Sequence, residues 1–211
     1  MSRSISMGKL LPALLLVIGL SAGVVQDSLA QTGTFSVRSL GLQKCSSFLE
    51  MIQSAENRTS AVLYSQWMAG YITAKNSTLG VLDVFPIRDP LDEWVRFVTL
   101  VCMSNQDKPI VEVMEGGIKA LEPYWTRAEG NSELVNVKSG ESSMNVYVDY
   151  LKSSQEFLSE RGYDLEVDGV FGEQTQAAFA KYKKDNGIVG PELPDSFFLI
   201  FVLAQPTGRD Q

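Results

Sequence analysis

The 211-residue chain contains no histidine and only two cysteines. Without an imidazole there can be no Ser-His-Asp or Cys-His nucleophile system, no His-ligated zinc and no histidine pH switch. Two cysteines are too few for a Cys₄ zinc site or an iron–sulfur cluster. Basic residues are also scarce, with 18 against 25 acidic ones and a net charge of −7. This charge disfavours binding to nucleic acid or to an anionic membrane surface. We expect no metal and no cofactor.

The first 30 residues have the three regions of a secretory signal peptide. Two basic residues precede the apolar run 10–20, and Ser28-Leu29-Ala30 forms a small-x-small cleavage site. The alternative is an uncleaved membrane anchor. Even extended to Val25, however, the apolar stretch is shorter than the roughly 20 residues that span a bilayer. We predict cleavage after Ala30, a bacterial periplasmic or secreted location, and no stable membrane insertion after cleavage.

Export determines how the two cysteines are interpreted. In an oxidising compartment, Cys45 and Cys102 are most simply one disulfide that closes a long loop. The alternative, a catalytic thiol, needs a base to form the thiolate, and the chain has no histidine for that role. We therefore predict a disulfide between Cys45 and Cys102.

Helical spacing of apolar residues dominates the region 31–125, where they recur at steps of three and four. The third of four such runs follows Asp89-Pro90, which suit an N-cap and a first helical position. The mostly apolar loop 79–87 should pack against these helices. The predicted helices cover about 42–52, 62–74, 91–102 and 110–121. We predict a disulfide-linked four-helix domain.

A segment with little periodicity, 126–144, is rich in glycine, serine, threonine and charge, which is typical of a linker. A smaller domain, 145–205, should follow, and 206–211 should form a tail. The three helices predicted for the domain 145–205 begin near Asn145, near Glu173 and at the apolar run 197–203. The predicted fold class is therefore all-α, with a four-helix N-terminal and a three-helix C-terminal domain.

A dense motif runs through the C-terminal domain. It consists of Gln155, Leu158, Gly162-Tyr163, Asp168-Gly169, Phe171-Gly172, Thr175, Ala178 and Gly187-Ile188. This motif strongly resembles the peptidoglycan-binding-like domain, a three-helix module of bacterial wall hydrolases and other envelope proteins. The resemblance spans 145 to about 205. The chain departs from the family at Tyr182-Lys183, where an aromatic residue followed by glutamine is usual.

This resemblance implies that the C-terminal domain binds peptidoglycan. Tyr163, Asp168 and Tyr182 are the preferred contacts, because aromatic rings stack on saccharide faces and a turn aspartate accepts hydrogen bonds. The alternative is that the motif only shapes turns and fills the core. The full candidate ligand set is Gly162, Tyr163, Asp168, Gly169, Phe171, Gly172, Thr175 and Tyr182.

The same stretch matches the opening of an EF-hand loop. Asp164, Glu166 and Asp168-Gly169 occupy the first positions, but Thr175 stands at the twelfth, where calcium needs a bidentate glutamate. We therefore expect no calcium site.

The N-terminal domain carries a second, looser pattern. Cys45, Cys102, Trp94 and the run 66–76 (QWMAGYITAKN) resemble the small exported helical proteins of the HdeA and Tai-type immunity group. Members of this group share one disulfide across a four-helix unit. Some are periplasmic acid-stress chaperones, and others block wall amidases delivered by type VI secretion. The resemblance covers 41–125.

This second resemblance implies a protein partner, with Trp67 and Tyr71 as the candidate contacts, and it leaves a homodimer open. The spacing alone places Trp67, Gly70, Tyr71 and Ala74 on one helix face, with Gly70 permitting close helix contact. Simple core packing is therefore the alternative interpretation of these residues.

Together these features predict a non-enzymatic exported protein. Its C-terminal domain associates with peptidoglycan, and its N-terminal domain binds an unidentified envelope protein, as an immunity or inhibitor protein does. One alternative is an acid-stress chaperone. Without residues 1–30 the chain has 16 basic and 24 acidic residues, so acid would reverse its net charge. Another is a carboxylate-dependent wall hydrolase, although pairs such as Glu112 and Glu115 are more simply a solvated helix face.

Overall fold

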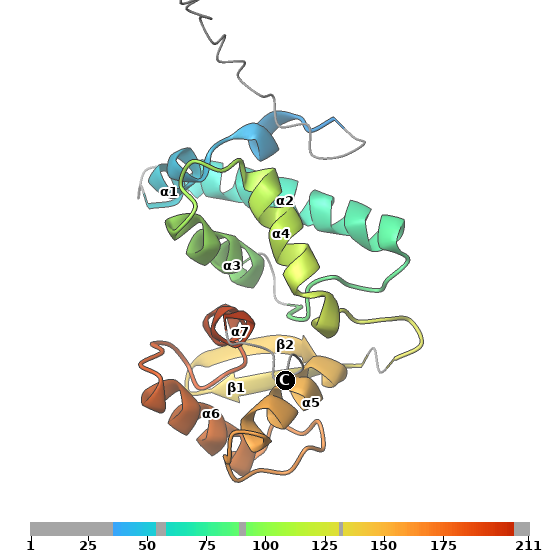
Figure 1. Cartoon of the computed structure of the whole chain (residues 1–211), viewed down its shortest axis with the longest axis vertical. Helices are drawn as coiled ribbons and strands as arrows, with labels where there is room; N and C mark the ends of the chain where they lie inside the picture. Colours follow the sequence, from blue (N-terminus) through green and yellow to red (C-terminus); the bar gives the residue numbers. More distant parts are fainter. Residues whose placement is uncertain (1–35, 54–57, 89–91, 131–132, 205–211) are drawn as a thin grey trace, which may run out of the picture.

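Figure 1 shows the computed structural model, which describes residues 36–53, 58–88, 92–130 and 133–204. Seven α-helices, two 3₁₀-helices and one β-hairpin are formed by these residues. The predicted signal peptide, the Asp89-Pro90 helix start and the 206–211 tail lie outside them. None of the helices in these ranges is long and apolar enough to cross a membrane.

Four helices build the N-terminal half, defined here as residues 36–130. They are α1 (Cys45–Gln53), α2 (Arg58–Leu79), α3 (Asp92–Met103) and α4 (Ile110–Ala120), accompanied by η1 (Ser39–Leu42) and η2 (Glu122–Tyr124). Glycine allows two close approaches between these elements. A Cβ at Gly117 would lie only 2.7 Å from Cε1 of Phe97, and one at Gly41 would overlap the Trp67 ring. The four helices predicted for this region are present, and each contributes buried residues to the core.

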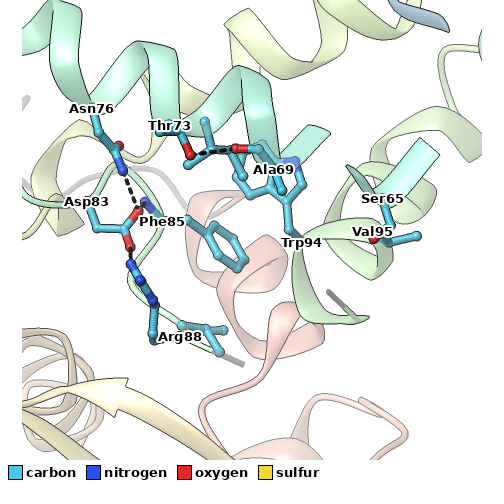
Figure 2. Close-up of a pocket in the computed structure, with 11 residues that line it drawn as sticks. Ser65, Ala69, Thr73, Asn76, Asp83, Phe85, Arg88, Trp94 and Val95 are labelled. Carbon is cyan, nitrogen blue, oxygen red and sulfur yellow. Dashed lines mark hydrogen bonds and ion pairs between the residues drawn. The ribbon is translucent and has the colours of Figure 1, made fainter. Parts of the chain in front are cut away.

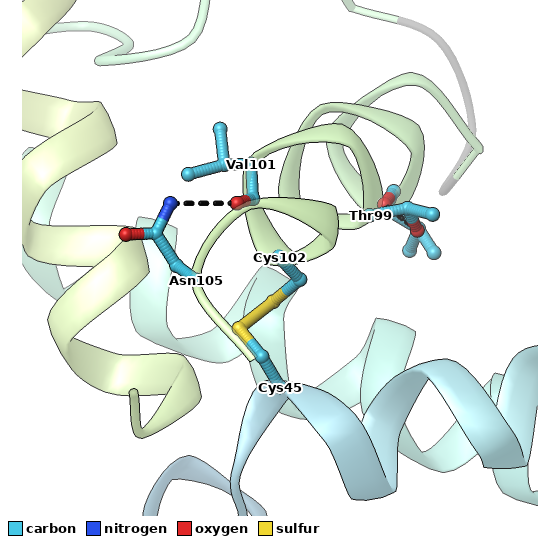
Figure 3. The surroundings of a disulfide bond; sticks show 6 residues. Cys45, Thr99, Val101, Cys102 and Asn105 are labelled. Atoms are coloured by element: carbon cyan, nitrogen blue, oxygen red, sulfur yellow. Dashed lines mark hydrogen bonds between the residues drawn. A yellow bond between two sulfur atoms is a disulfide. The ribbon is translucent and has the colours of Figure 1, made fainter. Parts of the chain in front are cut away.

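The predicted disulfide is confirmed. Cys45 at the start of α1 is bonded to Cys102 near the end of α3, and both residues are fully buried (Figure 3). The bond joins two helices that also pack against each other. It therefore links the start of α1 covalently to the end of α3.

The prediction of an all-α fold is wrong, because the C-terminal half (residues 133–204) begins with an antiparallel hairpin. Its strands are β1 (Leu134–Ser139) and β2 (Ser142–Tyr147), and the register pairs Ser139 with Ser142. Gly140, with φ +58°, occupies the first position of the two-residue turn, where a type II′ turn takes glycine. Val137, Met144 and Val146 are buried at alternate positions. The segment predicted as a linker therefore contains β1 and the start of β2.

Three helices follow the hairpin: α5 (Val148–Ser159), α6 (Glu173–Asp185) and α7 (Ser196–Leu203). The α5 helix ends in a Schellman motif, in which Gly162 has φ +81° and the Tyr163 N–H donates to the Leu158 carbonyl oxygen at 3.2 Å. The α7 helix begins at Asp195, whose carboxylate accepts the Phe198 N–H at 3.0 Å. These stop and start signals explain why three short helices form in so few residues.

The two halves share one hydrophobic core. Helix α7 lies against α3, between the N-terminal helices and the hairpin (Figure 1). The Ser196 N–H donates to Glu93 Oε2 at 2.8 Å, and the Ser196 hydroxyl donates to the Glu93 carbonyl oxygen at 2.6 Å. The segment 83–88 runs along β2, where the Arg88 N–H donates to the Asn145 carbonyl oxygen at 2.7 Å. Both halves are thereby fixed against each other by backbone and side-chain contacts.

Candidate functional site

One buried amide holds the turn between α5 and α6. Gln155 is 0% exposed. Its Nε2 donates to Asp168 Oδ1 at 3.0 Å, to the Val170 carbonyl oxygen at 3.1 Å and to Thr175 Oγ1 at 3.0 Å. Its Oε1 accepts the Gly169 N–H at 2.8 Å. The predicted ligand residues Asp168, Gly169 and Thr175 are thus brought together by a single side chain.

The centre of this turn depends on a glycine and a carboxylate. Gly169 has φ +80°, and a Cβ there would lie 2.9 Å from Val148 Cγ1 and 2.9 Å from Lys152 Cε. The Asp168 carboxylate is exposed to solvent and also accepts the Val170 N–H at 2.8 Å. Hydrogen bonds from that N–H and from Gln155 hold the pKa of Asp168 below its usual value. Both residues therefore have a structural role whatever else they contact.

The two predicted tyrosine contacts occupy different environments. Tyr163 is half-buried, and its hydroxyl donates to Asp185 Oδ2 at 3.0 Å. Tyr182 is 3% exposed and packs edge-to-face against Phe157 and Phe198, with ring centroids 5.5 and 5.6 Å away. The prediction of a saccharide contact at Tyr182 is at odds with this burial. Of the two rings, that of Tyr163 is the more accessible to a ligand.

The remaining predicted ligand residues mark the ends of helices and the edge of the core. Gly162 ends α5, Gly172 is the N-cap residue of α6, and Phe171 packs half-buried against Phe179 with centroids 6.0 Å apart. An open depression lies on the surface of the turn. It is lined by Glu166, Asp168, Val170, Gly172, Glu173, Gln174 and Thr175. Three members of the predicted set, Asp168, Gly172 and Thr175, thus share one surface.

Of the predicted partner contacts on α2, Trp67 packs against η1 and Tyr71 against α4. Trp67 and Tyr71 stack with ring centroids 5.4 Å apart, and both are half-buried. The Tyr71 hydroxyl donates to Glu115 of α4, which also forms an ion pair with Lys75 at 2.5 Å. Burial, followed by that hydrogen bond, raises the pKa of Tyr71. Gly70 is exposed, and a Cβ there would meet nothing within 4 Å, so the close helix contact expected at this glycine is not made.

Sequence reasoning missed a pocket of about 270 Å³ between α2, α3 and the segment 83–88 (Figure 2). Its lining consists of Ser65, Ala69, Ile72, Thr73, Asn76, Asp83, Phe85, Ile87, Arg88, Trp94 and Val95. Asn76, Asp83 and Arg88 lie on one side, and the Trp94 indole extends from α3 toward Ala69 on the other. The apolar loop 79–87 was expected to pack on the helices, but nothing in its composition indicated a pocket behind it.

The polar side of this pocket is organised around the buried carboxylate of Asp83. Its Oδ1 accepts from Asn76 Nδ2 at 3.3 Å and from the Phe85 N–H at 3.2 Å. Its Oδ2 accepts from Arg88 Nη1 at 3.0 Å and from the Tyr147 hydroxyl at 3.3 Å. Because Tyr147 belongs to β2, the wall of the pocket is attached directly to the C-terminal half. The Arg88 pKa is raised, mainly by the hydrogen bond to Asp83.

Within the described ranges, no group of three or more His, Cys, Asp or Glu side chains is placed to hold a metal ion. Comparisons of the chain with protein-family models, with curated proteins and with solved structures found no match. The two resemblances therefore rest on the residues of this chain alone.

Proposed function

We propose that this is an exported, non-enzymatic protein of the bacterial envelope. Its C-terminal half associates with peptidoglycan, and its N-terminal half binds a protein partner in the manner of an immunity or inhibitor protein. The proposal is supported by the signal-peptide pattern, by the disulfide, and by the motif that surrounds the α5–α6 turn.

The observation that carries the peptidoglycan half is the turn held by Gln155. The motif residues form a closed hydrogen-bond set beneath the surface, and this set fixes the exposed groups above it in one conformation. Among those groups are the Asp168 carboxylate and the exposed side chain of Val170. A ligand that binds here meets preorganised groups, so little conformational entropy is lost on binding.

Co-sedimentation with purified sacculi tests this half. Val170 is 60% exposed in the depression, whereas Val189 is 82% exposed outside its lining, so the two form a matched pair. We expect V170E to weaken binding about tenfold, equal to about 1.4 kcal/mol, and V189E to bind as the unaltered protein does. The whole chain is needed, because removing the N-terminal half would uncover α7. An unaltered protein that stays in the supernatant would overturn the proposal.

The partner-binding half is supported by the exposed face of α2. Leu63, 56% exposed, lies one turn before the stacked pair Trp67 and Tyr71. Large exposed apolar side chains beside aromatic rings are typical of protein interfaces. Affinity capture from the native envelope should retain a partner that L63D loses. M103D is the control, because Met103 is 59% exposed on α3. If L63D and M103D both lose the partner, or both retain it, the exposed face of α2 is not the interface.

The absence of catalysis is tested separately. Sacculi incubated with the protein should release no soluble muropeptides above the level of a buffer control. Release that persists after extensive purification would instead establish a wall hydrolase, and the carboxylates of the chain would then be examined by substitution.

A further inference from the structure

A lysine and an aspartate are in direct contact inside the C-terminal half. Lys183 in the last turn of α6 is 3% exposed, and Asp195, the residue before α7, is 0% exposed. Lys183 Nζ donates to Asp195 Oδ1 at 2.8 Å and to the Pro191 carbonyl oxygen at 2.6 Å. A Cβ at Gly190 would lie 3.2 Å from Asp195 Oδ2 and 3.9 Å from Lys183 Nζ, so the backbone of Gly190 covers both groups. An amine and a carboxyl group are thus held together in a buried place.

This environment disfavours the charged forms of both groups. Burial lowers the pKa of Lys183 and raises the pKa of Asp195, against the attraction between the two charges. Two further charged groups influence Lys183, but these, Glu93 and Arg96 of α3, form an ion pair with each other at 3.0 Å. Transfer of one proton from the ammonium to the carboxylate removes both buried charges and their cost of desolvation. The neutral pair consists of a free amine and a carboxylic acid, which are the two reactants of amide formation.

The two carboxyl oxygens of Asp195 differ in their partners. Oδ1 accepts the Phe198 N–H at 3.0 Å in addition to the Lys183 bond. Oδ2 is buried and has no hydrogen-bond partner among the residues that the structure describes. When an amine attacks a carboxyl carbon, negative charge develops on an oxygen, and a backbone N–H stabilises it. Oδ1 is placed to receive this charge, whereas no hydrogen bond retains Oδ2, which is therefore the oxygen that leaves.

We propose that Lys183 and Asp195 condense to an intramolecular amide bond between their side chains. Lys183 Nζ, a desolvated amine beside its target, attacks Asp195 Cγ. The Nζ–Cγ bond forms and the Cγ–Oδ2 bond breaks. Oδ2 leaves as water with its own proton and one proton from Nζ, so the step needs no oxidant and no other reactant. Oδ1 becomes the amide oxygen and keeps the Phe198 N–H, so the N-cap of α7 is preserved.

The consequence is a second covalent closure of the fold. The amide joins the end of α6 to the start of α7, the helix that packs against α3. The disulfide between Cys45 and Cys102 closes the N-terminal half, and the amide closes the C-terminal half with a bond that reductants do not break. This inference does not depend on binding to peptidoglycan or to a protein partner, so each can fail without the other.

Mass spectrometry of the whole folded protein, with its disulfide reduced for the measurement, is the first test. We expect the unaltered protein to be lighter than the mass calculated from its sequence by one water molecule. The variant K183R keeps a cation but has no primary amine, and it should have the full calculated mass. Tryptic peptides of the unaltered protein should place the missing water between Lys183 and Asp195.

The chain offers a matched control one turn away. Lys181 and Asp185 form the same kind of ion pair at 2.6 Å, but their side chains are 67% and 42% exposed, so water keeps both groups charged. This pair should not condense. In guanidinium chloride, an acetylating reagent should therefore modify Lys181 and leave Lys183 unmodified, because unfolding separates an ion pair but not an amide. The proposal is overturned if the unaltered protein has the full calculated mass, if K183R lacks the same water, or if Lys183 is acetylated as readily as Lys181.

Discussion

The α5–α6 turn and the pocket behind the segment 83–88 use buried polar groups in opposite ways. In the turn, the amide of Gln155 has a partner for its oxygen and three acceptors for its nitrogen. In the pocket, Trp94 Nε1 and Ser65 Oγ have none among the described residues. The paired groups of the turn hold its exposed surface in one conformation, whereas the two unpaired groups are enclosed and lower the stability of the fold. It also shows that a motif found in the sequence can have a mostly structural role.

The largest expected effect comes from the bond that supports the pocket-bearing half. Cys45 and Cys102 are 57 residues apart, and the chain-entropy relation assigns such a loop about 4 kcal/mol of unfolding free energy. The double variant C45S/C102S should therefore be less stable by about 4 kcal/mol in urea denaturation. Hydrogen exchange should show loss of protection in α1–α3 before α5 and α6. Equal loss of hydrogen-exchange protection in the two halves would mean that they unfold as one cooperative unit.

Removal of the amide at the centre of the turn should have the next largest effect. In Q155L the buried Gly169 N–H loses its acceptor, so we expect a loss of about 2–3 kcal/mol. Chemical denaturation measures this change in the free energy of unfolding. Q174L, an exposed glutamine in the same region, is the control and should stay within about 0.5 kcal/mol of the unaltered protein. A small effect of Q155L would contradict the structural role assigned to the motif.

A matched pair of buried serines compares the two regions directly. Ser154 Oγ donates to the Tyr150 carbonyl oxygen at 2.8 Å, whereas Ser65 Oγ has no partner among the described residues. S154A should cost about 1 kcal/mol, because a buried hydrogen bond is lost. S65A should cost nothing measurable or be stabilising, because an unpaired hydroxyl is removed. The reverse order in thermal or urea unfolding would show that Ser65 is paired in solution.

The smallest expected effect is a change in the pKa of Asp168 in the turn. The pKa of Asp168 is lowered by the Val170 N–H and Gln155, so its contribution to stability is present above its unfolded pKa. This contribution is lost as the pH falls through the lowered, folded pKa. In Q155L the Asp168 pKa should rise toward its ordinary value in an NMR titration. Asp185 is the control, because Lys181 and Tyr163 lower its pKa and neither contacts Gln155. Parallel shifts of both would point to general unfolding.

Much of the fold could be predicted from local patterns. Apolar spacing located all four N-terminal helices, and the glycines at 162 and 187 marked the ends of α5 and α6. The hairpin was missed because each strand contributes only a few alternating apolar residues among serines, asparagines and charges. So brief an alternation is weaker evidence than the composition, which resembles that of a linker.

The contacts between the halves could not be predicted, because they join residues far apart in the chain. Glu93 and Ser196 are separated by 103 positions, and neither belongs to a motif. The pocket could not be predicted either, because its walls come from three separate segments of the chain. Trp94 lies on the apolar face of a predicted helix, where it is indistinguishable from a core residue. Only the arrangement in space reveals that its N–H has no partner among the described residues.

The most direct test of the account is one residue-resolved NMR titration of the whole protein with a soluble disaccharide tetrapeptide from peptidoglycan. The proposed function predicts that the largest amide shifts fall in residues 166–174, around the depression on the α5–α6 turn. They should disappear in V170E and persist in V189E. If the amides of the turn remain unmoved at saturating fragment, or shift equally in V170E, the turn does not bind peptidoglycan.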